Sequence, residues 1–346
     1  MYNIPNKEPF GHMLGLNLEV AAMKIENHHI MPKKKLEMFE ILKEAILIPC
    51  KNINFIFFEV ITSLPLFCFL VYYEILLQTT LLETSQILRT PPGYINYNWP
   101  IPFHYKKLNW EFSHRLIQLT LLYLLPLHVL ELCSVLVTVD LASKIYAKEK
   151  SLTFKEMIQK PIQKTRLTGT FITSLYVLLL STCTLLGLIW LVTNYYVDLG
   201  NFVFDVFFDI FYGAAFIVLL IKYLEWTAMW NMSIVISIME GLYGHEALAF
   251  SAYFIRGSER RGLLLMLVFF VWGNGLRLPC LYAICFEGGN GIIAQISLFC
   301  VCNVIKWIAC MVYFYDCKVR ILEKKVDEER GGKDEQLTNK QCVKKT

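Results

Sequence analysis

The sequence predicts an all-α, polytopic membrane protein: a six-helix transmembrane bundle with an interfacial N-terminal helix and a cytoplasmic helical elbow between spans four and five. Composition is the first indication, because the chain of 346 residues is 55% hydrophobic and 18% charged. Soluble chains average about 45–50% apolar and about 25% charged residues. The apolar residues also lie in blocks of about 20 or more, the length that a helix needs to cross a hydrocarbon layer of ~30 Å. Lysine and arginine, finally, gather between alternate blocks.

The chain is expected to begin with a flexible cytoplasmic tail over residues 1–34. From Lys35, the run KLEMFEILKEAILIP spaces apolar residues mostly three and four apart, places charged residues between them and ends at Pro49. This pattern is typical of an amphipathic helix that lies in the membrane interface. The early residues contain lysines but no apolar signal-peptide core, so the first span is expected to act as the targeting signal.

The membrane domain is expected over residues 35–321, with six spans. These are about 53–77, 116–142, 168–196, 202–224, 262–286 and 291–315. The two terminal regions and the even-numbered connections hold 27 lysines and arginines, whereas the 78–115 connection holds four. Because positive residues stay on the cytoplasmic side, both termini are expected there. The charged residues 322–346 are expected to be disordered.

The stretch from Glu225 to Gly262 lies between the fourth and fifth spans and is too apolar for a solvated loop. Its Gly241–Gly244 break predicts two helices joined by a glycine elbow that braces the inner ends of the bundle. Small residues in the second helix favour close helix packing. Glu240 and Glu246 are expected to pair with Arg256, Arg260 or Arg261 nearby.

The order of residues in this stretch resembles a plant family of uncharacterised six-span membrane proteins. The residues that carry the resemblance are Glu240, Gly244, Glu246, Ala247, Ser251, Gly257, Arg260, Arg261 and Gly262. The segments ILKEAILIPCKNINF and TSLPLFCFLVYYEILL also match the start of that family, so the resemblance covers about 36–321. A more distant similarity is to the membrane region attached to some glycerophosphodiester phosphodiesterases. The resemblance implies the six-span fold but no activity, because the catalytic domain of those enzymes is absent from the sequence.

The second span contains an ionisable pair near its middle. His128 and Glu131 are three residues apart and therefore share a helix face. Ionisable groups at that depth usually face a partner or a water-filled cavity, and Lys306 in the sixth span is the expected counter-charge. Two interpretations stay open: a proton or ion relay or polar binding site, and an ion pair that fixes helix register. Glu59 and Glu74, towards the two ends of the first span, are expected to reach water.

The remaining patterns predict neither cofactor nor metal. Most of the eleven cysteines lie in apolar blocks and are expected to be structural, and the sequence lacks the common hydrolase, metalloprotease and nucleotide-binding motifs. The basic inner surface favours anionic lipids of the bilayer and does not imply nucleic acid. The first hypothesis is a non-enzymatic scaffold, trafficking or membrane-organising protein, with unknown protein partners, in the endomembrane system or plasma membrane. The alternatives are a small-solute or ion transporter using His128, Glu131 and Lys306, and an intramembrane lipid enzyme, for which no nucleophile or metal set is found.

Overall fold

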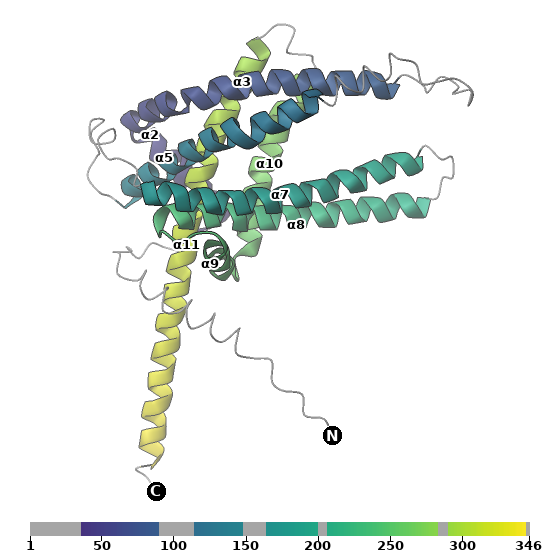
Figure 1. The fold of residues 1–346 in the computed structure, drawn as a ribbon. Helices are drawn as coiled ribbons and strands as arrows, with labels where there is room; N and C mark the ends of the chain where they lie inside the picture. The colour runs from purple at the N-terminus through teal and green to yellow at the C-terminus, as the bar shows by residue number, and fades with distance from the viewer. Residues whose placement is uncertain (1–35, 90–113, 148–163, 200–205, 283–289, 344–346) are drawn as a thin grey trace. The chain divides into compact units, whose positions relative to one another are not determined.

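The computed structural model describes residues 36–89, 114–147, 164–199, 206–282 and 290–343 (Figure 1). Its regular structure is helical in all five of these ranges, and they contain no strand. The expected tail over 1–34 lies outside the described residues. The predicted all-α class is confirmed for the residues that are described.

Five of the helices are long and apolar enough to cross a membrane. They cover Ile53–Thr80, His114–Tyr146, Arg166–Tyr195, Ile210–Met239 and Gly291–Lys324. Each overlaps one of the predicted spans. The chain is therefore a multi-pass membrane protein by the length and composition of its helices.

The outward faces of these helices are apolar. On α7 (Lys164–Leu199), Leu179, Leu186, Ile189 and Trp190 recur at helical spacing, and each is at least 60% exposed. A contiguous exposed apolar stripe marks a surface that another apolar phase covers. Lipid contact explains why this stripe is compatible with a stable protein.

The predicted fifth span, 262–286, corresponds to α10 (Glu259–Tyr282), which is not one of those five helices. Arginines 260 and 261 stand in its first turn, and the polar residues Asn274 and Arg277 follow its apolar run. The uninterrupted apolar segment between them is therefore short. The helix is confirmed as far as Tyr282, and its crossing of the membrane stays a prediction.

The chain divides into two compact units. Unit 1 comprises Met1–Ile41, Gln163–Leu263 and Cys310–Thr346, and unit 2 comprises Leu42–Ile162 and Leu264–Ala309. The third and fourth predicted spans thus belong to unit 1, and the first and second belong to unit 2. Helices α10 and α11 (Asn290–Val343) contribute residues to both units.

In unit 2, α3 (Ile53–Arg89) runs antiparallel to the helix made of η1 (Tyr123–Leu127) and α5 (His128–Tyr146). Glu59, near the start of α3, contacts Thr138 of α5. Tyr73, later in α3, packs against Tyr123 of η1, which precedes Thr138 in the chain, so the two helices run in opposite directions. The first part of α11 adds Ile292 and Ile296, which pack against apolar residues of α3. The buried interior of unit 2 therefore includes residues of α3, α5 and the first part of α11.

The predicted second span contains a single π-helical turn at Tyr123–Leu127. Pro126 lies within it and has no backbone N–H, so the regular hydrogen-bond ladder cannot continue unchanged through this point. A π-turn is one way in which a helix accommodates such a break and continues.

In unit 1, α7 and α8 (Val206–Met239) form an antiparallel pair, seen in teal and green in Figure 1. Tyr195 near the end of α7 lies 6.4 Å, ring centre to ring centre, from Tyr212 near the start of α8. The short helix α9 (His245–Ile255) packs against α8. Residues of the second half of α8, such as Val235 and Ile236, are completely buried and form much of the core of this unit.

The boundary between the fourth span and the elbow differs from the prediction. The sequence analysis ends the span near 224 and begins a separate helix at Glu225, but α8 continues without a break to Met239. No glycine or proline interrupts the helix there, and the Lys222 ammonium pairs with the Glu225 carboxylate one turn away at 2.6 Å. The chain turns only at Gly241 and Gly244, whose φ angles are +70° and +61°.

The N-terminal helix α2 (Met38–Cys50) is present where it is predicted. Its buried stripe is Ile41, Ala45 and Ile48, whereas Phe39, another apolar residue of the same run, is 75% exposed. Spacing of three and four residues fits more than one stripe of a short helix, and packing selects one of them.

The final helix is longer than predicted. The predicted sixth span ends at 315 and disorder is expected from 322, but α11 continues to Val343. The tail is rich in glutamate, lysine and glutamine, which are good helix formers in addition to being charged. Helix propensity therefore favours the described extension.

Candidate functional site

The elbow is defined as residues 239–262, from the end of α8 through α9 to the start of α10. Gly244 has φ +61° and ψ −130°, and its N–H donates to the Thr173 hydroxyl of α7 at 2.8 Å. Only glycine adopts such backbone angles without strain. The predicted importance of Gly244 thus has a backbone explanation.

The small residues of the family-like motif serve close packing. Ala247 and Ser251 of α9 are completely buried, and the Ser251 hydroxyl donates to the Met229 carbonyl of α8 at 2.5 Å. At Gly262, an added Cβ atom would lie 2.9 Å from the Tyr313 hydroxyl and 3.1 Å from the Ala228 Cβ. Helix backbones approach closely at these positions because no larger side chain stands between them.

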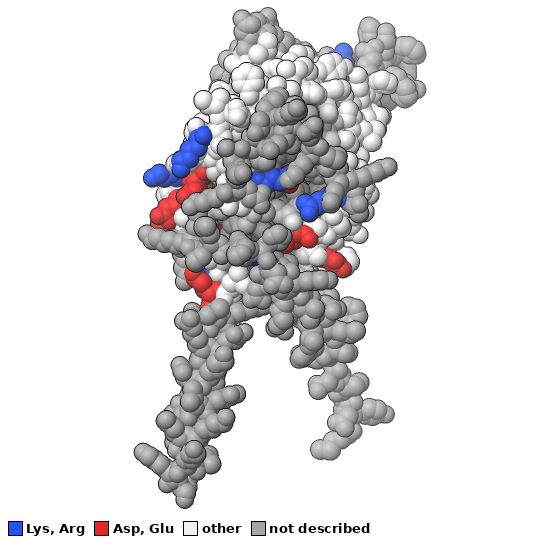
Figure 2. All heavy atoms as spheres, turned by 90° about the vertical axis from the view of Figure 1, so that its left-hand side faces the viewer, with Lys and Arg blue, Asp and Glu red and all other residues white. Residues whose placement is uncertain are grey.

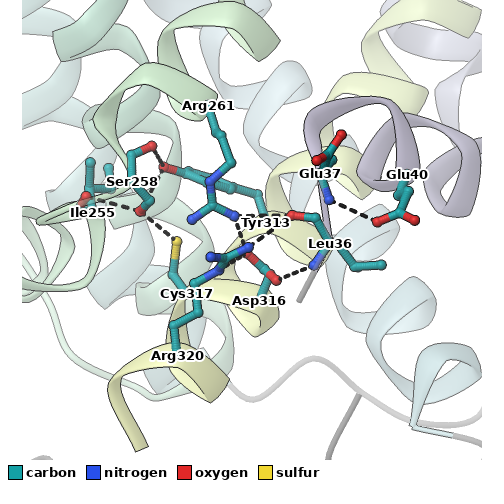
Figure 3. A network of polar contacts seen from close by, with 10 residues as sticks. All are labelled: Leu36, Glu37, Glu40, Ile255, Ser258, Arg261, Tyr313, Asp316, Cys317 and Arg320. Atoms are coloured by element: carbon teal, nitrogen blue, oxygen red, sulfur yellow. Dashed lines mark hydrogen bonds and ion pairs between the residues drawn. The ribbon is translucent and has the colours of Figure 1, made fainter. Parts of the chain in front are cut away.

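A charged cluster lies beside the elbow and is drawn in Figure 3. We call it the Asp316 cluster, and it consists of Leu36, Arg261, Asp316 and Arg320. One carboxylate oxygen of Asp316 accepts from Arg261 at 2.6 Å and from Arg320 at 2.8 Å, and the other accepts from the Leu36 N–H at 2.9 Å. Both guanidinium groups also donate to the Leu36 carbonyl, at 3.1 and 3.0 Å.

The Asp316 carboxylate is therefore surrounded by donors and balanced by two cations. Its side chain is 3% exposed, and those of Arg261 and Arg320 are 19% and 30% exposed. Charge-assisted hydrogen bonds of this kind are stronger than neutral ones. The cluster ties α10 and α11 to Leu36, which lies two residues before α2 and far away in the sequence.

A second group of contacts involves the α11 residues on either side of Asp316, namely Tyr313 and Cys317. The Tyr313 hydroxyl donates to the Ser258 carbonyl at 3.0 Å, and the Ser258 hydroxyl lies 3.3 Å from the Cys317 thiol (Figure 3). Gly257, with φ +83°, forms the turn that brings Ser258 to this position. These contacts secure the turn between α9 and α10.

Glu240 pairs with Lys318 of α11 at 2.8 Å, and both side chains are largely buried. The prediction that the elbow glutamates pair with the elbow arginines is therefore wrong for Glu240. For Arg261 it is also wrong, because its partner is Asp316. The partners come from the last helix, and the sequence analysis missed Asp316, Lys318 and Arg320. The available indication was the run DCKVR directly after the last apolar block, but sequence does not show which charges meet across helices.

Four charged residues of the elbow point outwards. Glu246, Arg256, Glu259 and Arg260 are exposed, and none has an ion pair or hydrogen-bond partner among the described side chains. Figure 2 shows described basic and acidic side chains on one face. Because the exposed Glu246 and Glu259 lie close in sequence to these arginines, the predicted basic surface includes acidic residues where it is described, while the connection at 148–163 lies outside the described residues.

The predicted site in unit 2 is not assembled as expected. His128, Glu131 and Lys306 are each half-buried, but no ion pair joins Glu131 and Lys306. The Lys306 ammonium lies 4.8 Å from the centre of the Trp307 ring. The shared face of His128 and Glu131 follows from helix geometry, whereas the rotation of α11 is decided by its packing.

The two glutamates of α3 are more deeply buried than the predicted pair. The expectation that they reach water is wrong, because Glu59 is 5% exposed and Glu74 is 1% exposed. One oxygen of Glu74 accepts from Arg277 at 3.0 Å, and the other accepts from the amides of Gln78 at 3.3 Å and Gln295 at 3.2 Å. Glu74 is surrounded by donors and has a cationic partner.

Glu59 has a different environment. One of its oxygens lies 2.7 Å from the Thr138 hydroxyl and 3.5 Å from the Ser134 hydroxyl, both on α5. Its other oxygen is buried and has no hydrogen-bond partner in the described structure. No described cation bonds to it. Three ligand-type side chains (His, Cys, Asp or Glu) do not converge on a metal-sized site anywhere in the described ranges.

A family model described as Domain of unknown function (DUF8558) matches residues 23–319 of the chain. The chain belongs to this family. The matched residues include the elbow, both glutamates of α3, and Asp316 and Lys318, and they end just before Arg320. No curated protein and no solved structure matches the chain.

Proposed function

We propose that this chain is a non-enzymatic, membrane-organising scaffold in the plasma membrane or an endomembrane, with the elbow as its docking platform. One observation carries the proposal: four residues of the motif, Glu240, Gly244, Ser251 and Arg261, form their bonds inside unit 1. Because these groups bond to other residues of unit 1, they stabilise the conformation of the elbow and are not available for catalysis. The exposed charges at its edge then supply the contacts to anionic lipids or a protein partner.

The exposed arginines of the elbow are the part that a partner would reach. Lys and Arg near a membrane surface attract anionic headgroups by about 1 kcal/mol each. Because Glu246 and Glu259 lie close by in the sequence, the surface is mixed in charge. A mixed surface favours a partner with an arrangement of both charges over one that is only anionic.

Proximity labelling of the full chain in its native cell tests this role. Arg260→Glu is compared with Arg166→Glu, since both arginines are exposed and belong to unit 1. We expect both variants to accumulate normally and only Arg260→Glu to lose a subset of labelled neighbours. An unchanged set of neighbours in Arg260→Glu, or catalytic turnover by the purified protein, would contradict the scaffold proposal.

The proposed topology has α10 as a sixth span and both termini in the cytoplasm. Pairing of Arg277 with Glu74 supports it, because a paired cation is less costly in a membrane than an isolated one. Tags at the two ends, probed in selectively permeabilised cells, provide the test. Five spans would place the tags on opposite sides, and six place both inside.

Small-solute or ion transport is a second candidate, in which the half-buried His128, Glu131 and Lys306 would take part. One observation favours it: the deeply buried Glu59 carboxyl has no cationic partner, and such groups within a span often mark ion pathways. Flux measurements with the purified protein in liposomes distinguish the candidates. The scaffold proposal predicts no flux above that of empty liposomes.

A further inference from the structure

The hydrogen bonds around Glu59 depend on whether its carboxyl group carries a proton. The Thr138 hydroxyl oxygen lies 2.7 Å from a Glu59 oxygen and 2.8 Å from the Ser134 backbone carbonyl oxygen. Both distances are those of O–H···O hydrogen bonds. A hydroxyl group has one proton to donate, and a backbone carbonyl has none.

If Glu59 is ionised, one of these two contacts has no proton. The carboxylate and the Ser134 carbonyl are then both acceptors competing for the single Thr138 proton, and one short oxygen–oxygen contact is repulsive. If Glu59 carries a proton, the two contacts form a chain. Glu59 donates to the Thr138 oxygen, and Thr138 donates to the Ser134 carbonyl, so that both bonds are made.

The second oxygen of Glu59 leads to the same assignment independently. It is buried and has no donor in the described structure. In an anion that oxygen would carry charge in an apolar interior with no compensation, which costs several kcal/mol even after relaxation. In the neutral acid it is an uncharged oxygen, for which the cost is much smaller.

The charged groups on the helices around α3 do not compensate Glu59. On α5, Asp140 pairs with Lys144, and Glu131 would add only negative charge. On α10, Arg277 pairs with Glu74, and on α11, Lys306 lies over Trp307. None of the other titratable side chains described on these neighbouring helices bonds to Glu59; they include His128, Cys133, Tyr146, Cys300 and Cys302.

We propose that Glu59 is a proton-binding site inside the membrane-spanning part of unit 2, occupied at neutral pH, with its proton donated to the Thr138 hydroxyl. The ligand is the proton itself. Glu74 on the same helix provides the matched comparison, since its oxygens contact only donors and Arg277 balances its charge. The site does not depend on the proposed scaffold role, and its failure would leave the labelling and topology tests untouched.

Infrared spectroscopy of the full chain in lipid nanodiscs at neutral pH tests the assignment. We expect the wild-type minus Glu59→Gln difference spectrum to contain the C=O stretching band of a protonated carboxylic acid. The corresponding spectrum for Glu74→Gln should contain carboxylate bands. Carboxylate bands for Glu59, or a protonated band for both residues, would overturn the proposal.

A second variant tests the proposed hydrogen bond from Glu59 to Thr138 without removing the acid. Thr138→Val is nearly isosteric and deletes the acceptor of the Glu59 proton. We expect the protonated-acid band to move in frequency in this variant, because its hydrogen bond is lost. Thr79→Val is the control, since its hydroxyl bonds only to its own helix in α3. A Thr138→Val spectrum that is identical to the wild-type spectrum would overturn the proposed donor–acceptor pair.

Discussion

Asp316 in unit 1 and Glu59 in unit 2 are both buried carboxyl groups, but the atoms around them differ in what they can donate. Asp316 is contacted by two guanidinium groups and a backbone N–H. Glu59 is contacted by hydroxyl groups, one of which already has another acceptor. The difference teaches that burial alone does not decide the charge of a carboxyl group. The hydrogen-bond donors and cations around the group decide it.

Glu74 separates the effect of position from the effect of neighbours. It lies on the same helix as Glu59 and is even less exposed, yet its contacts resemble those of Asp316. Depth in α3 is therefore not the reason for the state proposed for Glu59. Four substitutions test the comparison, and they are ordered by expected effect.

Asp316→Ala should have the largest effect. It leaves the Arg261 and Arg320 guanidinium groups without their shared anion, and breaking a buried pair by removing one partner costs about 3–5 kcal/mol. Thermal unfolding of the detergent-solubilised protein measures the loss. Arg260→Ala is the control, because that arginine is exposed, and surface changes usually stay within about 0.5 kcal/mol. Equal unfolding temperatures for the two variants would show that the Asp316 cluster does not hold unit 1 together.

Arg277→Met should convert Glu74 into a group that resembles Glu59. It removes the cation and leaves two amide donors, and a lost hydrogen bond to a charged group costs about 1.5–3 kcal/mol. The double variant Arg277→Met/Glu74→Gln should recover part of this loss, because no unbalanced anion remains. Thermal unfolding of both variants gives the two values. If the double variant is less stable than the single one, charge balance is not what Arg277 provides.

Gly244→Ala tests the backbone of the elbow separately from its charges. The positive φ of +61° is strained for alanine, and such strain costs about 1–3 kcal/mol. Gly275→Ala is the matched control, since Gly275 is helical and a Cβ atom there meets nothing within 4 Å. The control should be neutral or stabilising by up to about 1 kcal/mol. Normal accumulation and an unchanged unfolding temperature for Gly244→Ala would show that the conformation of the elbow does not stabilise unit 1.

Glu59→Gln should have the smallest effect. A neutral acid and an amide have nearly the same shape, and volume-conserving changes usually cost less than about 1.5 kcal/mol. The side-chain NH2 group of glutamine can replace the acid proton towards Thr138. Thermal unfolding of this variant is compared with that of Glu74→Gln. Glu74→Gln should be more destabilising, because it leaves the Arg277 guanidinium without its anionic partner. The reverse order would break the comparison between the two glutamates.

Much of the architecture was predictable because it depends on local composition. Apolar blocks of sufficient length determine where the helices cross, and five of the six predicted spans coincide with helices that meet this requirement. The turn at Gly241 and Gly244 was likewise predictable, because glycine adopts a positive φ far more readily than other residues. The end of α8 was misplaced because apolar and charged residues alternate there without any helix breaker.

The polar sites were less predictable. His128 and Glu131 were selected for their depth, yet Glu59 and Glu74, which the sequence places nearer to the ends of a span, are more deeply buried than either. Glutamates 240 and 246 were assigned to nearby arginines, although Glu240 pairs with Lys318 from another helix and Glu246 is exposed. Sequence distance is a poor guide to partners when helices bring residues together from far along the chain.

From the sequence alone, one can determine that this protein is helical, that it lies in a membrane and that a glycine turn follows its fourth span, because each depends on a short stretch of chain and its solvent. Only the tertiary structure decides which charges are balanced. The partners of Asp316, Glu240 and Glu74 come from helices whose rotation is set by packing. The environment of Glu59 likewise exists only where α3 meets α5. Whether a buried acid keeps its proton is a property of the atoms that surround it, and those atoms are assembled by the fold.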